Sequence, residues 1–220
     1  MMGLMADPTA DRTADQDGPD GGQPAGDAVW DPWSPEEVLA RLGGTALTWC
    51  VTAGWAIDLF VGRRTRDHHD LEICVPRARW PALRAALPEL DFLAAGDGRL
   101  WPADAPALER FFQTWGRDGR GAFRLDVFRD PHDGDTWICR RDPTIRRPYA
   151  TLIETTPSGV PFMAPEVTLL FKAKHDRDKD RHDLRVALPL LDAARVGWLR
   201  TALARVHPGH PWSALLDVDR

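Results

Sequence analysis

The chain has 220 residues, a hydrophobic fraction of 43% and a formal net charge of −5. This length allows one or two domains with a sizeable core. The net charge excludes a global basic field of the kind that holds nucleic acid, so we expect no nucleic-acid partner. Mild acidity suits a cationic small substrate, and it is equally the ordinary state of a soluble protein.

Cysteine usage and hydropathy indicate the cellular setting. The three cysteines, Cys50, Cys74 and Cys139, match neither a zinc spacing nor a disulfide framework. We therefore expect a reduced, cytoplasmic setting. No apolar run is long enough to cross a bilayer and the N-terminus does not resemble a secretory signal, so we expect no membrane association. The oligomeric state stays open between monomer and homodimer.

Ordered structure is expected to begin near Trp30. Residues 1–28 are rich in small and acidic residues and bury too little apolar surface to offset the entropy of ordering, so they predict a disordered tail. The segment 34–44 (SPEEVLARLGG) predicts a helix, because Ser34 and Glu37 form a capping box and two glycines close it. The apolar run 47–52 predicts a core strand.

The stretch 52–75 (TAGWAIDLFVGRRTRDHHDLEICV) organises the rest of the chain. Within these 24 residues, glycine turns, a basic segment and an acidic strand lie next to one another in the sequence. It predicts, in order, a small-residue turn at Ala53-Gly54, a helix over 55–61, a stop at Gly62, a basic loop over 63–68 and a strand that carries Asp70 and Glu72.

The two carboxylates of that strand carry its chemistry. Side chains at i and i+2 share a face, so Asp70 and Glu72 point one way while Leu71 and Ile73 point into a core. A same-face carboxylate pair beside a glycine turn and a basic loop outlines a site for a divalent metal and phosphate. The alternative is an edge strand with two solvent-facing acids, which the spacing alone does not exclude.

A third carboxylate lies in a later strand, predicted over 123–130 (FRLDVFRD). Asp126 interrupts an otherwise apolar alternation, and a buried carboxylate is costly unless it is paired or binds a metal. If the two strands are neighbours, Asp70, Glu72 and Asp126 converge on one metal cluster, as two-metal phosphoryl-type transfer requires.

The remaining patterns predict an α+β fold, in which a mixed β-sheet with flanking helices is followed by a small C-terminal helical bundle. We expect a catalytic domain over 29–163 and a helical domain over 164–220. The further expected elements are a helix near Pro81, strands over 91–95 and 99–101, a helix around 107–115, a strand over 136–139, a hairpin over 151–163, and helices over 166–175, from 178 or 180 to 191, and over 193–206.

Lysine is used in only one place. The chain has 28 Lys plus Arg, but its three lysines all lie between Lys172 and Lys179. Lysine is a compact point charge that suits phosphate, whereas arginine is a planar fork. Chance clustering on a solvated helix face explains the same pattern.

The run GWAIDLFVGRRTRDHHDLEI resembles the signature of the aminoglycoside and lincosamide nucleotidyltransferases, a branch of the polymerase-beta-type nucleotidyltransferase superfamily. Gly54 matches the glycine of the turn, Asp70 and Glu72 match the acidic pair, and Asp126 in RLDVF matches the third carboxylate. The turn of this family usually has two small residues of the Gly-Gly or Gly-Ser kind, whereas here it is Ala53-Gly54. Alanine adopts positive φ only at a cost.

The resemblance extends over about residues 35–192. The segment PEVTLLFKAKHDRDKDRHDL is similar to the helical region of that branch, in which a KD-x-x-D element recurs. Lys179, Asp180 and Asp183 occupy the positions of that element.

The resemblance implies Mg²⁺-dependent transfer of a nucleoside monophosphate, with AMP the expected group, from a nucleoside triphosphate to a hydroxyl of a small molecule. An aminoglycoside-like antibiotic is one candidate acceptor. Asp70 and Glu72 would hold the metal, and Asp126 would complete the site and act as general base. The resemblance thus gives these three residues both metal-binding and catalytic roles.

The nucleotide phosphates would be contacted by Gly54, Trp55, Arg66 and Lys174. We prefer Lys174 to Lys172, which lies closer to the apolar run. Two alternatives keep the fold but change the function. One is a toxin–antitoxin-type nucleotidyltransferase that modifies a protein, and the other is a non-catalytic binding module.

Overall fold

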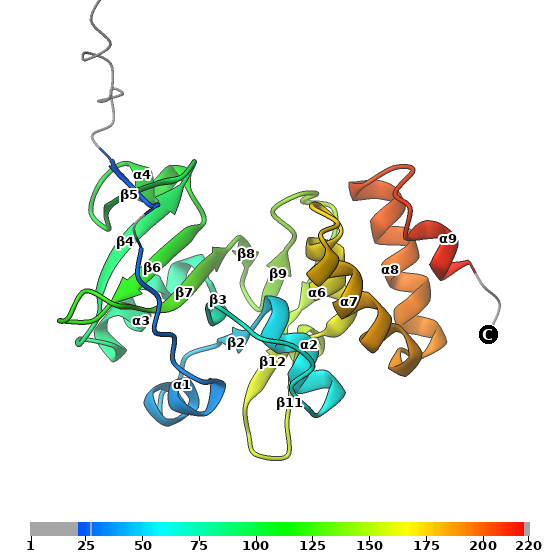
Figure 1. Cartoon of the computed structure of the whole chain (residues 1–220), viewed down its shortest axis with the longest axis horizontal. Helices are drawn as coiled ribbons and strands as arrows, with labels where there is room; N and C mark the ends of the chain where they lie inside the picture. The colour runs from blue at the N-terminus through cyan, green and yellow to red at the C-terminus, as the bar shows by residue number, and fades with distance from the viewer. Residues whose placement is uncertain (1–21, 27, 218–220) are drawn as a thin grey trace, which may run out of the picture.

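The computed structural model describes residues 22–26 and 28–217, and it is mixed α/β (Figure 1). The described strands form a nine-stranded sheet in the order β1-β5-β4-β6-β7-β3-β2-β12-β11 and a three-stranded sheet in the order β10-β9-β8. The strands are β1 Gln23–Pro24, β2 Cys50–Val51, β3 Glu72–Pro76, β4 Asp91–Gly96, β5 Arg99–Pro102, β6 Gln113–Arg117, β7 Phe123–Asp130, β8 His132–Asp133, β9 Thr136–Ile138, β10 Arg146–Pro148, β11 Ile153–Thr155 and β12 Pro161–Met163.

The helices gather mainly at one end of the large sheet, where α6, α7, α8 and α9 lie together, while β4, β5 and β6 lie at the other end (Figure 1). This arrangement confirms the predicted α+β class with its C-terminal helices. None of the helices in the described ranges has the length and apolarity that crossing a membrane requires. The helices are α1 Pro35–Leu42, α2 Ala53–Val61, η1 Arg77–Arg79, α3 Trp80–Ala86, α4 Ala107–Arg110, α5 Tyr149–Leu152, α6 Pro165–Lys172, α7 Asp178–Ala187, η2 Leu188–Leu190, α8 Ala193–Val206 and α9 Ser213–Leu216.

Regular structure starts earlier than the sequence predicted. Most of the expected tail, residues 1–21 and 27, lies outside the described residues. Gln23 and Pro24 nevertheless form β1, which pairs antiparallel with Leu100 and Arg99 of β5. The prediction that order begins near Trp30 was therefore wrong for this short segment, because backbone pairing to a remote strand supplies what its side chains lack.

Local sequence signals placed α1 well. The Ser34 hydroxyl accepts from the backbone N–H of Glu37 at 3.2 Å, and the Glu37 carboxylate accepts from that of Ser34 at 2.8 Å. This reciprocal capping box was predicted from the spacing of the two residues. The apolar face of α1, with Val38 and Leu42 fully buried, packs into the same core as α3 and β3.

The middle of the chain corrects one predicted element. The expected helix around 107–115 is only the single turn α4, and the chain continues as β6, which pairs antiparallel with both β4 and β7. Thr114 and Gly116 are buried in this strand. Strand pairing on two sides outweighs the weak helical pattern of residues 113–115, a tertiary effect that local propensity does not contain.

The pairing of β3 with β7 sets the geometry of the sheet centre. The two strands run parallel, with Glu72 opposite Asp126 and Ile73 opposite Val127. β3 also pairs antiparallel with β2, so it is an interior strand. Leu71, Ile73 and Val127 are fully buried on the opposite face from the carboxylates. The structure thus confirms the predicted alternation of polar and core residues.

Two residues with positive φ bracket α2. Ala53 opens the helix with φ 53°, and Gly62 closes it with φ 78°. Only the second position has the residue type that accepts this conformation without strain.

Replacing Ala53 by glycine is therefore expected to raise the free energy of unfolding by about 0.5 to 1 kcal/mol, the strain relieved less the entropy that glycine adds to the unfolded chain. Gly62→Ala is the matched control and should lower it by about 1 kcal/mol. Urea denaturation of both variants measures the difference. A loss of stability in Ala53→Gly would contradict a strained turn.

Candidate active site

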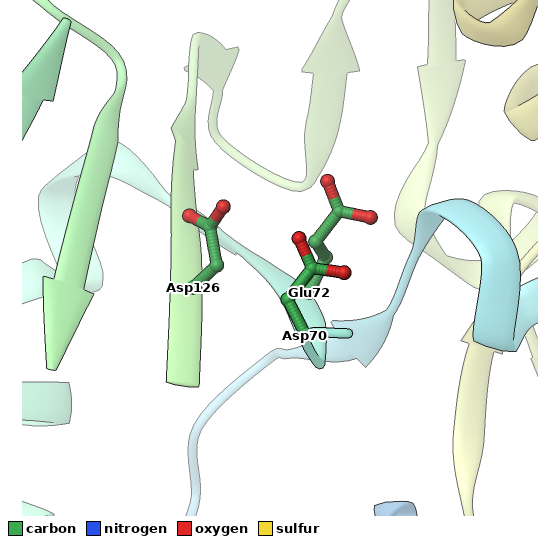
Figure 2. A group of neighbouring side chains, drawn as sticks. All are labelled: Asp70, Glu72 and Asp126. Carbon is green, nitrogen blue, oxygen red and sulfur yellow. The ribbon is translucent and has the colours of Figure 1, made fainter. Parts of the chain in front are cut away.

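Three carboxylates meet at the centre of the sheet (Figure 2). Asp70 lies two residues before β3, Glu72 begins the strand, and Asp126 lies opposite Glu72 on β7. One ligand oxygen from each residue lies within 4.8 Å of the other two. The condition set by the sequence, that the two strands be neighbours, is met. The alternative of a solvent-facing edge strand is wrong, because β3 lies between β7 and β2.

The close approach of these acids changes their protonation. Burial, and then the charge of Asp70, raise the pKa of Glu72 to about 7. Burial, and then the charge of Glu72, raise the pKa of Asp126 well above its ordinary value. Without a cation, the fold therefore holds protons at this site near neutral pH.

The donor set fits a hard divalent cation. The Gln113 side-chain amide donates to Asp126 Oδ2 at 2.5 Å, whereas Asp126 Oδ1 is buried with no hydrogen-bond partner in the described structure. A buried carboxylate oxygen without a donor, facing two further carboxylates, is the environment that Mg²⁺ satisfies. Asp70, Glu72 and Asp126 are thus suitable ligands in both number and chemistry.

A cleft of about 740 Å³ opens over the carboxylates. Asp70 and Glu72 line it, and Asp126 is almost completely buried beside them. The four residues that the sequence assigned to nucleotide binding also line the cleft: Gly54, Trp55, Arg66 and Lys174. The structure therefore brings the predicted residues to one cavity, and their individual roles stay predictions.

Gly54 is required by its neighbours. A Cβ at this position would collide with the Arg66 guanidinium and come within 2.7 Å of His68 Nδ1. His68 is held in turn by a 2.7 Å contact between its Nε2 and Asp58 Oδ2, and its ring stacks on Trp55 at 4.5 Å. The glycine thus lets the basic loop pack directly against the start of α2.

A buried ion-pair network fixes that loop to the helical end of the chain. Arg66 donates to both carboxylate oxygens of Asp183 at 2.8 and 2.9 Å. Lys172 Nζ lies 2.6 Å from Asp183 and 3.7 Å from Asp180. Arg177 donates to Asp180 at 2.8 Å. Both aspartates are fully buried, so the acidic residues of the KD-x-x-D element hold cations of the chain itself.

Some cations of the cleft are paired with buried aspartates, and others have no ion pair in the described structure. Arg66 and Lys172 are committed to Asp183, which favours a positioning role for both. Lys174 and Lys179 are exposed on the cleft and form no ion pair within the described ranges. The sequence preference for Lys174 over Lys172 agrees with this geometry. Lys179 was not assigned to the site, although its place in the lysine cluster was the available signal.

The sequence also missed a rigid cation at the cleft wall. Arg140 donates to buried Asp130 at 3.0 Å and lies between the rings of Phe128 and Phe171, at 4.3 and 4.7 Å from their centroids. Trp137 Nε1 donates to the second oxygen of Asp130 at 2.7 Å. The signal was present, because Asp130 shares the face of Asp126 by the two-residue period of β7. Gln113, in contrast, had no recognisable signal.

Comparison with known proteins agrees with this geometry. Residues 36–102 match the family model of aminoglycoside-2''-adenylyltransferase. No match was found among the curated proteins.

Three solved structures share the fold. The solution structure of the antibiotic-resistance factor ANT(2'')-Ia is 19% identical, with a TM-score of 0.53, and the match covers 82% of this chain and 91% of that chain. ANT(2'')-Ia in complex with adenylyl-2''-tobramycin is 18% identical, with a TM-score of 0.53 and coverage of 77% and 94%. The lincomycin-bound lincosamide antibiotic adenylyltransferase LnuA is 14% identical, with a TM-score of 0.51 and coverage of 71% and 95%.

The fold, the three carboxylates and the matched family model together define a nucleotidyltransferase enzyme. Within that class, the chain is similar to the aminoglycoside and lincosamide nucleotidyltransferases, and the resemblance seen in the sequence is confirmed.

The buried network generates a stability prediction. Asp183→Ala is expected to lower the free energy of unfolding by about 3 to 5 kcal/mol, because it removes the close partner of buried Lys172 and the bidentate partner of part-buried Arg66. Asp178→Ala, on the same helix, removes only an exposed partner of Arg181 and should leave stability nearly unchanged. Chemical denaturation measures both, with Asp183→Asn as a milder variant. Equal effects of Asp183→Ala and Asp178→Ala would contradict a structural role of the network.

The carboxylates generate a pH prediction for the protein in EDTA. The pKa of Glu72 is about 7 in the folded chain and ordinarily 4.5, so between these values the folded chain binds more protons than the unfolded chain. The free energy of unfolding should therefore fall as pH rises from about 4.5 to 7. In Glu72→Gln the fall should be smaller, with the variant more stable than the native chain at pH 8. Parallel pH profiles would contradict the raised pKa.

Proposed function

We propose that this enzyme transfers AMP from ATP to a hydroxyl group of a small antibiotic-like molecule and releases pyrophosphate, with Mg²⁺ as the metal. The single observation that carries the proposal is the convergence of Asp70, Glu72 and Asp126 at one cleft, with a buried oxygen of Asp126 left without a partner. Two of the similar structures, one with adenylyl-2''-tobramycin and one an adenylyltransferase with bound lincomycin, support this class of acceptor.

The roles follow from the positions of the side chains. Asp70, Glu72 and Asp126 would hold the metal, which supplies charge neutralisation for the triphosphate when bound. Lys174 and Lys179 add two cations at the cleft that offset the charge of the phosphates. Gly54 keeps the start of α2 close to the basic loop, and Ala53, Gly54 and Trp55 line the cleft. We assign the backbone N–H groups of this helix N-terminus to phosphate contact.

The chemical step requires one proton acceptor. The acceptor hydroxyl oxygen attacks the α-phosphorus, the bond from that phosphorus to the bridging oxygen breaks, and pyrophosphate leaves with the bonding electrons. Asp126 is our candidate for accepting the hydroxyl proton, because it lies on a different strand from Asp70 and Glu72 and its side chain is oriented by the Gln113 amide, which donates to Oδ2.

The test is pyrophosphate release from ATP in the presence of hydroxylated antibiotics, with the acceptor products identified by mass. Asp126→Asn is expected to reduce the rate by at least about 100-fold, in line with loss of a general base. In parallel, ATP with Mg²⁺ should raise the melting temperature of the native chain but not that of the double variant Asp70→Asn, Glu72→Gln.

Two results would contradict the proposal. An unchanged rate in Asp126→Asn would exclude it as base and ligand, and a retained metal-dependent shift in the double variant would exclude the metal site. Label appearing on proteins of a lysate would indicate the protein-modifying alternative, and no nucleotide binding at millimolar Mg²⁺ would indicate the non-catalytic one.

A further inference from the structure

The two walls of the cleft differ in charge. The wall formed by α6, α7 and the segment between them carries Lys174 and Lys179, which form no ion pair in the described part of the chain. The opposite wall, formed by the β4–β5 turn and the segment between α4 and β6, carries Arg110, which is 3.2 Å from Asp97. A triphosphate needs uncompensated cations, which assigns it to the first wall and the acceptor to the second.

The second wall is aromatic. Phe111 and Phe112 precede β6, line the cleft and are both half-buried. The ring of Phe111 stacks on Trp101, with centroids 5.0 Å apart and planes 21° apart, and a Cβ at Gly96 would collide with it. We call Phe111 and Phe112 the aromatic wall. It leads directly to Gln113, whose amide donates to Asp126, so a molecule on this wall lies next to the proposed proton acceptor.

The carboxylates of the cleft are already paired. Eight Lys and Arg residues and five Asp and Glu residues line it, and two of those five are Asp70 and Glu72. The other three each have an arginine partner: Asp67 with Arg64 at 3.0 Å, Asp97 with Arg110 at 3.2 Å and Asp130 with Arg140 at 3.0 Å. Apart from the carboxylates assigned to the metal, the described lining thus offers no unpaired anion to the ammonium groups of a substrate.

We infer that the aromatic wall is the acceptor subsite, and that it takes a hydroxylated molecule with an apolar or planar part and at most one positive charge, rather than a polycationic aminosugar. This inference rests on the proposed function. A polycation would find the lining carboxylates outside the metal site already paired with arginine, which opposes its binding. An apolar or planar part gains by covering the half-buried ring of Phe112, since Phe111 is already packed against Trp101 and Arg110.

The test measures equilibrium binding of two probes to the full chain by calorimetry, with Mg²⁺ and a non-hydrolysable ATP analogue present. Lincomycin combines a hydroxylated sugar, an apolar part and a single basic amine, whereas tobramycin carries several amino groups. We expect lincomycin to bind at least about ten-fold more tightly, with little dependence on salt. Tobramycin binding should be weak at every salt concentration.

Variants of the wall sharpen the test. Phe112→Ala should weaken lincomycin binding by about ten-fold, while the matched variant Phe112→Leu, which keeps an apolar side chain, should retain most of it. Arg110→Gln leaves Asp97 without its arginine partner and should shift the preference towards tobramycin, with a salt dependence that the native chain lacks.

Tighter or equal binding of tobramycin, or no detectable binding of lincomycin, would overturn the inference. Titration of the nucleotide analogue alone, and pyrophosphate release from ATP with each antibiotic, report on the proposed function separately. If the nucleotide analogue binds with Mg²⁺ and tobramycin is adenylylated, the proposed function stands and only the acceptor class is wrong. If the native chain does not bind the analogue, the proposed function fails and the inference fails with it.

Discussion

The parallel register of β3 and β7 is the constraint on which the site depends. It sets Glu72 directly opposite Asp126 and, with Asp70 two positions before the strand, gathers three like charges. Neither strand could avoid this by slipping, since a shift of one residue would turn Ile73 and Val127 out of the core. The apolar face of the sheet therefore enforces an arrangement that its acidic face disfavours. Such a conflict between stability and local charge is expected at a site selected for chemistry.

A second set of buried carboxylates is neutralised by cations of the chain itself. Asp180 and Asp183 lie on α7, Lys172 ends α6, and Arg66 belongs to the basic loop before β3. One charge cluster therefore joins the helical end of the chain to the basic loop. Each aspartate of this cluster forms direct ion pairs with cations, whereas no ion pair is found for Asp70, Glu72 or Asp126 within the described residues. Lys172, Lys179 and Arg140 act on Glu72 only through their charge. The contrast separates a structural charge cluster from one prepared for a ligand.

The sequence predicted what short-range chemistry decides. The capping box of α1, the alternation of β7, and the acidic centre followed from spacings of two or three residues. The strand β6 was mistaken for helix because its two partners lie elsewhere in the chain. The pairing of Arg66 with Asp183 spans 117 positions, and no local pattern in the basic loop announces a partner at that distance. From the loop sequence alone, Arg66 was therefore assigned to phosphate contact. In the structure its guanidinium donates to Asp183, and a contact with phosphate stays a prediction.

The net charge of the whole chain and the charges that line the cleft lead to different expectations about the substrate. The whole chain carries −5, which taken alone suits a cationic substrate as well as it suits ordinary solubility. The cleft differs from this average, because in the described structure each lining carboxylate outside the metal site is paired with an arginine. Because fields at ångström distances are set by the nearest groups and screening removes more distant ones, the lining decides what can bind. The acidity of the chain therefore belongs mainly to surfaces outside the cleft, and it does not argue for a polycationic acceptor.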